Sequence, residues 1–335
     1  MADIGKTLNI LDTIDKNFRV ELERIEREIL SSIPNSSPSL LHNASEHLIN
    51  NGGKRIRPTL LMLSQKTLNS KVDLNQILPV AVAIELIHTS TIIHDDIIDC
   101  SSLRRGGQTV NARWGDDVAL IAGDLIFSRA FGLISSYEDK RISDSIYDAC
   151  KKLADGQILE TIHTGDTNMT EEVYLEIIER KTASLFEAST RCGAILGGGN
   201  KKEVESLSRY GFLIGTGFQM TDDALDISAG EFQLGKPVGV DVTLGKPTFL
   251  ILHALRKASV KDKKFLERVL NKGDVTLDDI NKARDIIKRN NSLEYAFNRS
   301  NSFITQAKDE IKHFKESKAK EALLRIADYA INRGS

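Results

Sequence analysis

The sequence contains little cysteine and no long uninterrupted apolar run. Three cysteines stand isolated in 335 residues, which argues against a disulfide framework and favours a reducing compartment. The N-terminus lacks the basic and then apolar pattern of a signal peptide. The most apolar stretch, Ile77 to Ile93, is interrupted by Glu85 and His88, and each of these residues is costly in lipid. We therefore expect a cytoplasmic protein without a membrane span.

An excess of charge of either sign is also missing, because the formal net charge is −2 and the pI is near 6.4. Proteins that bind nucleic acid usually carry a basic stripe, so we expect no nucleic-acid partner. No segment alternates polar and apolar residues as a strand does, whereas apolar residues recur at helical spacing. The sequence predicts an all-α protein with helices at residues 8–30, 40–49, 59–68, 77–98, 109–134, 141–162, 171–196, 203–227 and beyond residue 248.

The stretch from Glu85 to Gly107 places charged side chains where a buried helix should be apolar. Asp95 and Asp99 share one helix face, and His88 continues that face two turns earlier. Carboxylates at this spacing repel each other by about 0.2–0.5 kcal/mol. They are the hard oxygen ligands that suit Mg²⁺, which also binds waters and substrate phosphates. The stretch therefore predicts a magnesium site.

Basic side chains occur in two places beside glycine. Arg104 and Arg105 follow the aspartates and offer forked donors that recognise phosphate. Lys54, Arg55 and Arg57 follow two glycines and open a helix. Cations oppose the dipole at a helix N-terminus, and a bound anion would remove the conflict. A solvated basic loop is the alternative for this second run.

A second acidic cluster repeats the geometry of the first on another apolar helix. It consists of Asp222, Asp223 and Asp226, with Gln219 one turn before it. Either cluster alone is compatible with a solvated face. Two clusters together favour metal binding and a diphosphate substrate.

Three further lysines and one glycine-rich run match no functional motif by themselves. Lys181 lies in a helix, while Lys236 and Lys246 each stand between glycine and proline in a loop, so the three lysines could be incidental. The GGGNKK run at residues 197–202 lacks the spacing of a phosphate-binding loop and predicts a helix end. No zinc-type spacing and no nucleophile with a motif context is present.

These motifs together resemble those of the trans-isoprenyl diphosphate synthases, and the likeness spans nearly the whole chain. DDxxD occurs at Asp95–Asp99 and is followed by Arg104-Arg105-Gly106; it occurs again at Asp222–Asp226, and GGKRxRP occurs at residues 52–58. The resemblance implies a single domain over residues 1–335, an isoprenoid-synthase-type helical bundle around a deep central cavity, and a homodimer. It also implies ionisation of an allylic diphosphate, attack by the alkene of isopentenyl diphosphate, and loss of a proton to the departing diphosphate.

The resemblance also implies a role for each matching residue. The isopentenyl diphosphate would be held by Lys54, Arg57, His88 and Arg105. The allylic diphosphate would be surrounded by Arg104, Lys181, Thr182, Gln219, Lys236 and Lys246. Three Mg²⁺ ions would be bound by Asp95, Asp99 and Asp222, with support from Asp96, Asp223 and Asp226.

Product length depends on the residues that precede the first aspartate motif. Each helical turn away from Asp95 is about 5.4 Å, roughly one isoprene unit. Ser90 and Thr91 lie about one turn away and are small, whereas one of these positions is typically aromatic in family members that make short products. The pattern resembles medium- and long-chain synthases, with a product of C25 or longer and Phe127 or Phe131 as the candidate floor. A C20 product is the alternative, and Ser90→Phe is expected to shorten the product.

Two other functions remain open. A class I terpene cyclase would share DDxxD but should carry a different second metal motif and has no use for the GGKRIRP run. A non-catalytic subunit of a heteromeric synthase should have lost carboxylates or arginines, and none is missing here. Some farnesyl synthases close the site with a basic C-terminal tail, for which this chain offers only Arg333.

Overall fold

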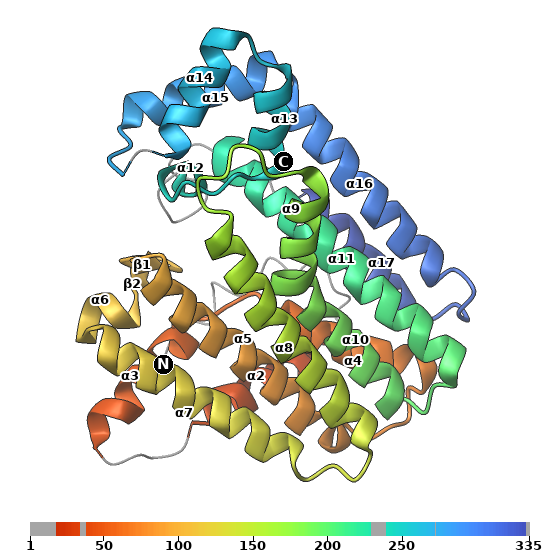
Figure 1. The fold of residues 1–335 in the computed structure, drawn as a ribbon. Coiled ribbons are helices and arrows are strands. Elements are labelled where there is room, and N and C mark those ends of the chain that lie inside the picture. Colours follow the sequence, from red (N-terminus) through yellow and green to blue (C-terminus); the bar gives the residue numbers. More distant parts are fainter. Residues whose placement is uncertain (1–17, 34–37, 229–238, 272, 333–335) are drawn as a thin grey trace. The chain divides into compact units, whose positions relative to one another are not determined.

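The computed structural model describes residues 18–33, 38–228, 239–271 and 273–332. They belong to two compact units, each built from several chain segments. Of the described residues, unit 1 comprises 18–33, 38–147, 185–211 and 310–326, and unit 2 comprises 148–184, 212–228, 239–271, 273–309 and 327–332. The two units are described separately below, and a single domain over residues 1–335 stays a prediction. Figure 1 labels the elements along the chain.

The described chain is almost entirely helical, as the sequence predicts. In chain order its elements are α2 (Arg19–Leu30), α3 (Ser39–Asn50), α4 (Ile56–Leu68), η3 (Leu74–Gln76), α5 (Leu78–Ile98), β1 (Leu103–Arg104), β2 (Gly107–Gln108), α6 (Val110–Trp114), α7 (Asp116–Ile134), α8 (Lys140–Ile162), α9 (Glu171–Ile178), η4 (Glu179–Ala183), α10 (Ser184–Leu196), α11 (Lys201–Ser228), α12 (Val240–Thr243), α13 (Phe249–Lys257), α14 (Val260–Leu270), α15 (Leu277–Arg289), α16 (Ser292–Glu310) and α17 (Lys318–Asn332).

Helix α5 forms the centre of unit 1 and packs against α2, α4 and α7 (Figure 1). Its residues Ile84, Leu86 and Ile87 are fully buried, which explains why the predicted helix reads as apolar on nearly all faces. Helix α7 approaches α5 closely at Gly123, where an added Cβ would lie 2.2 Å from Nε2 of His94. The first aspartate motif is therefore carried by a helix fixed on several sides.

The helix predicted over residues 109–134 is in fact two helices. Gly115 separates α6 from α7 with a φ of 89°, a left-handed conformation that glycine adopts without steric cost. The Thr109 side chain caps α6 by accepting a hydrogen bond from the backbone N–H of Ala112. The prediction of one helix was wrong because an apolar pattern can continue across a glycine that changes the chain direction.

The helix predicted over residues 171–196 is also interrupted. A π-helical turn, η4, separates α9 from α10 and contains Lys181 and Thr182. Gly156 of α8 faces this turn, since an added Cβ would lie 2.5 Å from the backbone nitrogen of Lys181. Single π-helical turns are frequent at functional sites.

In the described part of the chain, the exception to the predicted all-helical structure is a pair of short strands, β1 and β2. They form an antiparallel hairpin in which Leu103 pairs with Gln108 and Arg104 pairs with Gly107. Arg105 and Gly106 at its tip have left-handed φ values of 54° and 75°. This hairpin holds the two arginines that follow the first aspartate motif.

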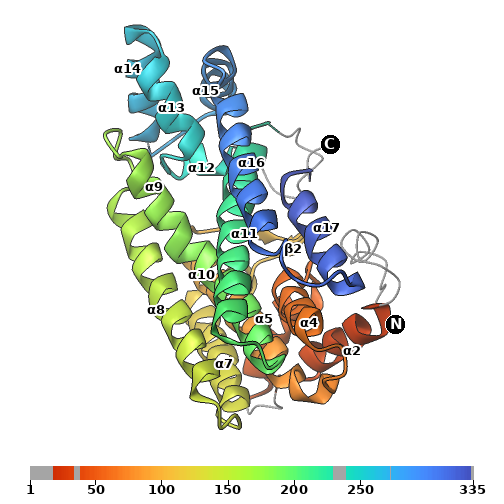
Figure 2. The same cartoon turned by 90° about the vertical axis from the view of Figure 1, so that its right-hand side faces the viewer.

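In unit 2, α11 and α16 pack together, and both Figure 1 and Figure 2 show them side by side. The Ser300 hydroxyl donates to the Gly217 carbonyl at 2.8 Å and lies 2.8 Å from the hydroxyl of Thr221. Helices α13, α14 and α15 pack against one another in the same unit. Within the described residues, no helix is long and apolar enough to cross a membrane.

Candidate active site

The first aspartate motif lies at the C-terminal end of α5. Asp95 and Asp96 are in the last helical turn, and Asp99 is the residue that ends the helix, with its backbone N–H bonded to the Asp95 carbonyl at 2.8 Å. Asp95 and Asp99 are half-buried, whereas Asp96 is buried. The negative end of a helix dipole disfavours carboxylates, so a cation at this end would be stabilising.

Asp96 points to an arginine rather than to its two neighbours in the motif. Its Oδ1 accepts hydrogen bonds from Nε and Nη2 of Arg104, at 2.9 Å and 2.5 Å. Burial raises the pKa of Asp96, although this arginine opposes the shift. Asp96 therefore fixes Arg104 near the end of α5.

The basic loop before α4 is organised by Arg55. This residue has a left-handed φ of 47° and is buried. Its guanidinium donates to Glu26 at 2.7 Å and 3.0 Å, to Glu85 at 2.9 Å and to the Ile49 carbonyl at 3.1 Å. Burial alone would lower the pKa of Arg55, but Glu85 and Glu26 raise it. A buried guanidinium with this many acceptors fixes the loop between Lys54 and Arg57.

Three of the four side chains predicted to hold isopentenyl diphosphate, Arg57, His88 and Arg105, interact electrostatically in unit 1. Burial, followed by the charges of Arg57 and Arg105, lowers the pKa of His88 well below its ordinary value. Burial also lowers the pKa values of Arg57 and Arg105 to about 10. His88 is consequently neutral near pH 7, and the surrounding positive charge would be stabilised by an anion.

Arg57 packs on an aromatic ring and keeps one buried N–H without a hydrogen-bond partner in the described part of the chain. Its guanidinium carbon lies 4.5 Å from the centre of the Phe186 ring, a cation–π distance. Its Nε is buried and has no hydrogen-bond partner among the described residues. A buried donor of this kind costs free energy until it is satisfied. Lys54, in the same loop, is exposed.

Arg105 connects the hairpin to the glycine loop. Its Nη1 donates to the carbonyls of Leu48 and Gly52. An added Cβ at Gly53 would lie 3.0 Å from the Arg55 guanidinium and 3.1 Å from that of Arg105. Glycine at this position therefore leaves room for both guanidinium groups.

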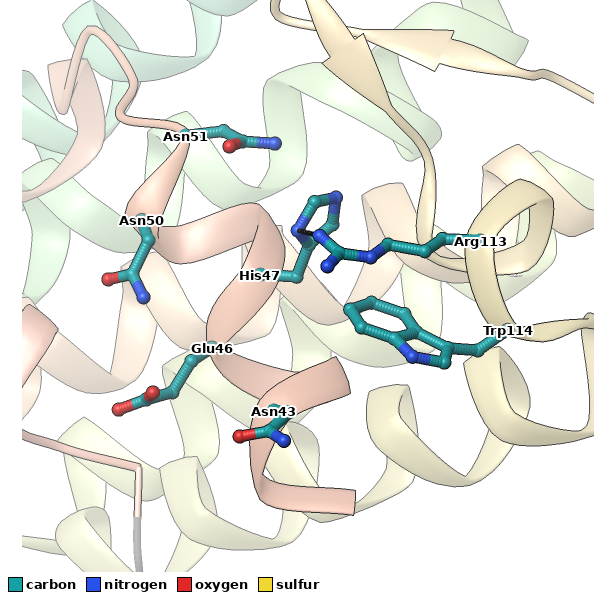
Figure 3. Close-up of a pocket in the computed structure, with 7 residues that line it drawn as sticks. All are labelled: Asn43, Glu46, His47, Asn50, Asn51, Arg113 and Trp114. Atoms are coloured by element: carbon teal, nitrogen blue, oxygen red, sulfur yellow. Dashed lines mark hydrogen bonds between the residues drawn. The ribbon is translucent and has the colours of Figure 1, made fainter. Parts of the chain in front are cut away.

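A cluster on α3 and α6 holds the other strand of the hairpin. His47 lies 2.7 Å from the Gln108 carbonyl through Nε2 and 3.3 Å from Arg113 Nη1 through Nδ1. Because arginine can only donate, His47 carries its proton on Nε2 and donates to Gln108. Arg113 also covers the Trp114 ring at 4.5 Å. Figure 3 shows these side chains at an open pocket of about 380 Å³ outside the predicted site.

In unit 2, the second aspartate motif belongs to a chain of hydrogen bonds. Thr182 donates to Gln219 at 2.9 Å, Gln219 donates to Asp223 at 2.7 Å, and the Tyr174 hydroxyl donates to Asp223 at 2.6 Å. Burial raises the pKa of Asp223 to about 7, against the effect of these hydrogen bonds. The structure thus brings together Thr182, Gln219 and Asp223. Asp222, which directly precedes Asp223 in the sequence, is half-buried.

Asp226 lies in the last part of α11, and Lys246 lies in the chain that follows α12. Asp226 accepts a hydrogen bond from the backbone N–H of Asp241 at 3.2 Å. Lys246 and Lys181 both form ion pairs with Glu160. Lys236, which was also predicted to surround the allylic diphosphate, and Arg333 of the tail lie outside the described residues.

The carboxylates present fit a magnesium ion by their chemistry. Among the described residues, no three His, Cys, Asp or Glu side chains are grouped as a metal site. Mg²⁺ needs only one or two carboxylates when waters and phosphates complete its coordination. Asp95 and Asp99 supply such a pair at the end of α5, and they would hold the ion.

The residues predicted to set product length lie on α5 and α7. The buried Ser90 hydroxyl donates to the Gly123 carbonyl of α7 at 2.9 Å, whereas Thr91 is half-buried and donates to the His88 carbonyl at 2.8 Å. The Phe127 and Phe131 rings are 5.0 Å apart, and Phe131 is 38% exposed. The role of these four residues stays a prediction.

Several supporting residues could not be found from the sequence. Glu160, Tyr174 and Glu26 have no motif context, and only the structure shows their partners. The sequence did indicate that Glu85 has a partner, because a charged residue in an apolar helix requires one.

Comparison with known proteins identifies the family. The model for the polyprenyl synthetase family matches residues 38–287. The chain is 40% identical over 330 residues to a short chain isoprenyl diphosphate synthase of Methanothermobacter thermautotrophicus, covering 97% of this chain and 99% of that one. It is 33% identical over 323 residues to an octaprenyl diphosphate synthase of Haemophilus influenzae, covering 96% and 97%.

Structural comparison gives the same answer. A polyprenyl synthase of Caulobacter crescentus, crystallised with calcium and isoprenyl diphosphate, superposes with a TM-score of 0.92 at 31% identity and covers 97% of this chain and 98% of that one. The all-helical fold is therefore that of the isoprenoid synthases, and the family uses divalent metal ions. The chain belongs to the polyprenyl synthetase family of trans-prenyltransferases.

Proposed function

We propose that this enzyme condenses isopentenyl diphosphate head to tail (1′-4) with an allylic diphosphate and releases a trans-polyprenyl diphosphate of C25 or longer. The observation that carries the proposal is the arginine cluster around His88, which exists in addition to the aspartate motifs. A terpene cyclase has no second diphosphate to bind and needs no such cluster. Two groups of basic residues support the proposal of two diphosphate substrates.

The proposed ligands of isopentenyl diphosphate are Lys54, Arg57, His88 and Arg105. Arginine forks donate pairs of hydrogen bonds to phosphate oxygens. The neutral His88 can donate one N–H without adding charge. Arg55 fixes the loop that carries Lys54 and Arg57 through its bonds to Glu85 and the Ile49 carbonyl.

The allylic diphosphate is proposed to be bound by Arg104, Lys181, Thr182, Gln219, Lys236 and Lys246. These donors would stabilise the negative charge that develops on the departing diphosphate. Three Mg²⁺ ions, with Asp95, Asp99 and Asp222 as ligands and Asp96, Asp223 and Asp226 in support, would neutralise diphosphate charge when bound. The chain itself orients the diphosphate through Arg104, which Asp96 holds in place.

A product of C25 or longer is supported by the small residues before the motif. Neither Ser90 nor Thr91 carries an aromatic ring that could close a tunnel. The relatives above include both a short chain and an octaprenyl synthase, so identity alone does not select a length. A C20 product is the second candidate.

We also propose a homodimer.

The test is to incubate the purified chain with Mg²⁺, isopentenyl diphosphate and each allylic primer, and to measure product length by mass spectrometry. Magnesium-dependent elongation to C25 or beyond is expected, and Asp95→Ala should lose at least about 10²-fold in turnover. Full turnover of Asp95→Ala would contradict the metal assignment. A wild-type chain without any magnesium-dependent activity would instead favour a non-catalytic subunit, and products ending at C20 would favour the second candidate.

A further inference from the structure

Glu160 of α8 joins two lysines that come from different elements of unit 2. Its Oε2 lies 2.6 Å from Nζ of Lys181 and 3.3 Å from Nζ of Lys246. The three side chains are largely buried, with exposed fractions of 21%, 18% and 15% for Glu160, Lys181 and Lys246. One carboxylate oxygen therefore serves two ammonium groups, and the group as a whole carries a net charge of +1.

The backbone around this group is shaped so that the three side chains can meet. Gly156, one turn before Glu160, allows α8 to lie directly against the backbone nitrogen of Lys181. Gly245, next to Lys246, has a left-handed φ of 68°, and its carbonyl accepts a hydrogen bond from the Gly165 N–H at 2.8 Å. An added Cβ at Gly245 would lie 2.5 Å from the Leu270 carbonyl oxygen. The ion pairs are thus fixed by packing, unlike exposed surface pairs.

The charge states are also defined. Burial would raise the pKa of Glu160, but Lys181 and Lys246 lower it below its ordinary value. Glu160 is therefore ionised near pH 7 and occupies the position of an anion between the two ammonium groups. A diphosphate that binds to these lysines has to compete with it.

We propose that Glu160 is a positioning residue that sets the affinity of Lys181 and Lys246 for a diphosphate. It holds the two ammonium groups in place before substrate arrives, and it neutralises half of their charge so that the diphosphate product leaves after each condensation. This inference rests on the proposed role of both lysines in binding the allylic diphosphate. Glu160 acts through the lysines and need not touch the substrate.

Glu160→Gln keeps the side-chain volume and removes the charge. Inorganic diphosphate is expected to inhibit this variant about 10-fold more strongly than wild type in competition with the allylic substrate. The KM for the allylic diphosphate and kcat should both fall, because release becomes slower, while kcat/KM for isopentenyl diphosphate stays unchanged. Glu160→Asp keeps the charge and should restore an inhibition constant close to that of wild type. An unchanged or weaker inhibition of Glu160→Gln overturns the inference.

The matched control is Glu176→Gln in the same unit. Glu176 pairs with Arg180 at 2.5 Å over one helical turn, and its loss should leave diphosphate inhibition unchanged. If it strengthens inhibition equally, the effect is one of overall charge and the inference falls.

A charge cycle keeps the test decisive even if one variant folds poorly. Lys246→Gln should weaken diphosphate binding, and adding Glu160→Gln to it should restore binding toward the wild-type value, because the net charge returns to +1. Calorimetry with magnesium and inorganic diphosphate measures this without turnover. A double variant as weak as Lys246→Gln overturns the inference. Absence of condensation by wild type would instead remove the proposed function while leaving the binding cycle readable.

Discussion

The arginines of the basic loop differ in whether carboxylates neutralise them. Arg55 is the most buried guanidinium of the basic loop and is matched by Glu26 and Glu85. Removing one partner of such a buried pair costs about 3–5 kcal/mol, because the other charge is left without compensation. Among the described residues, the neighbouring Arg57 and Arg105 form no comparable ion pairs with carboxylates, and burial lowers their pKa values to about 10. The loop therefore combines a structural arginine with arginines suited to an anion.

His88 predicts a pH dependence of stability in the ligand-free protein. Its pKa is lowered on folding, so as the pH falls below about 6.5 the unfolded chain takes up a proton before the folded chain does. Stability should decline by up to about 1.4 kcal/mol for each pH unit below that point. In urea unfolding between about pH 7.5 and pH 5.5, the stability of His88→Gln should therefore fall less steeply than that of wild type. Identical slopes for wild type and variant would contradict the pKa shift.

At the scale of helices, the sequence predicted positions better than boundaries. The predicted helix over residues 77–98 matches α5, and the one over residues 203–227 matches α11. Periodicity could not reveal the break at Gly115 or the π-helical turn at Lys181, since both depend on backbone conformation within a continuous apolar pattern. Residues on one helix, such as Asp95 and Asp99, could be paired from spacing, whereas the partners of Glu160 come from separate elements.

The packing of α5 against α7 sharpens the product-length prediction. Ser90 contacts the Gly123 carbonyl, so a phenylalanine at residue 90 must displace α7, whereas Thr91 is half-buried and bonds only within its own helix in the contacts described. Thr91→Phe should shorten the product by at least one isoprene unit of about 5 Å while retaining the wild-type melting temperature. Ser90→Phe should also shorten it but lower that temperature, because overpacking typically costs about 1–3 kcal/mol.

Thr91→Val is the matched control for this pair, since it keeps the shape and removes only the hydroxyl. Its product length should equal that of wild type. A Thr91→Phe enzyme that makes products of unchanged length would exclude residue 91 from the path of the growing chain.

At the scale of the whole molecule, some of the predicted site residues belong to unit 1 and others to unit 2. The first aspartate motif and the His88 cluster belong to unit 1, and the second aspartate motif with Glu160, Lys181 and Lys246 belongs to unit 2. Local patterns such as DDxxD identify each group separately. They carry no information on long-range partners, which is why Tyr174 beside Asp223 was not anticipated.

The proposed function assigns Asp95 and Asp222 to the metal ions that bind one allylic diphosphate, and ligand-induced stabilisation tests this assignment. A non-reactive thiolo analogue of an allylic diphosphate, added with Mg²⁺ at about 100 times its Kd, should raise stability by about 2.7 kcal/mol. Asp95→Asn and Asp222→Asn should each abolish the resulting rise in Tm, and omission of Mg²⁺ should do the same to wild type. Retention of the full rise by either variant would show that its aspartate does not contribute to binding the same diphosphate, and would limit the metal site to one motif.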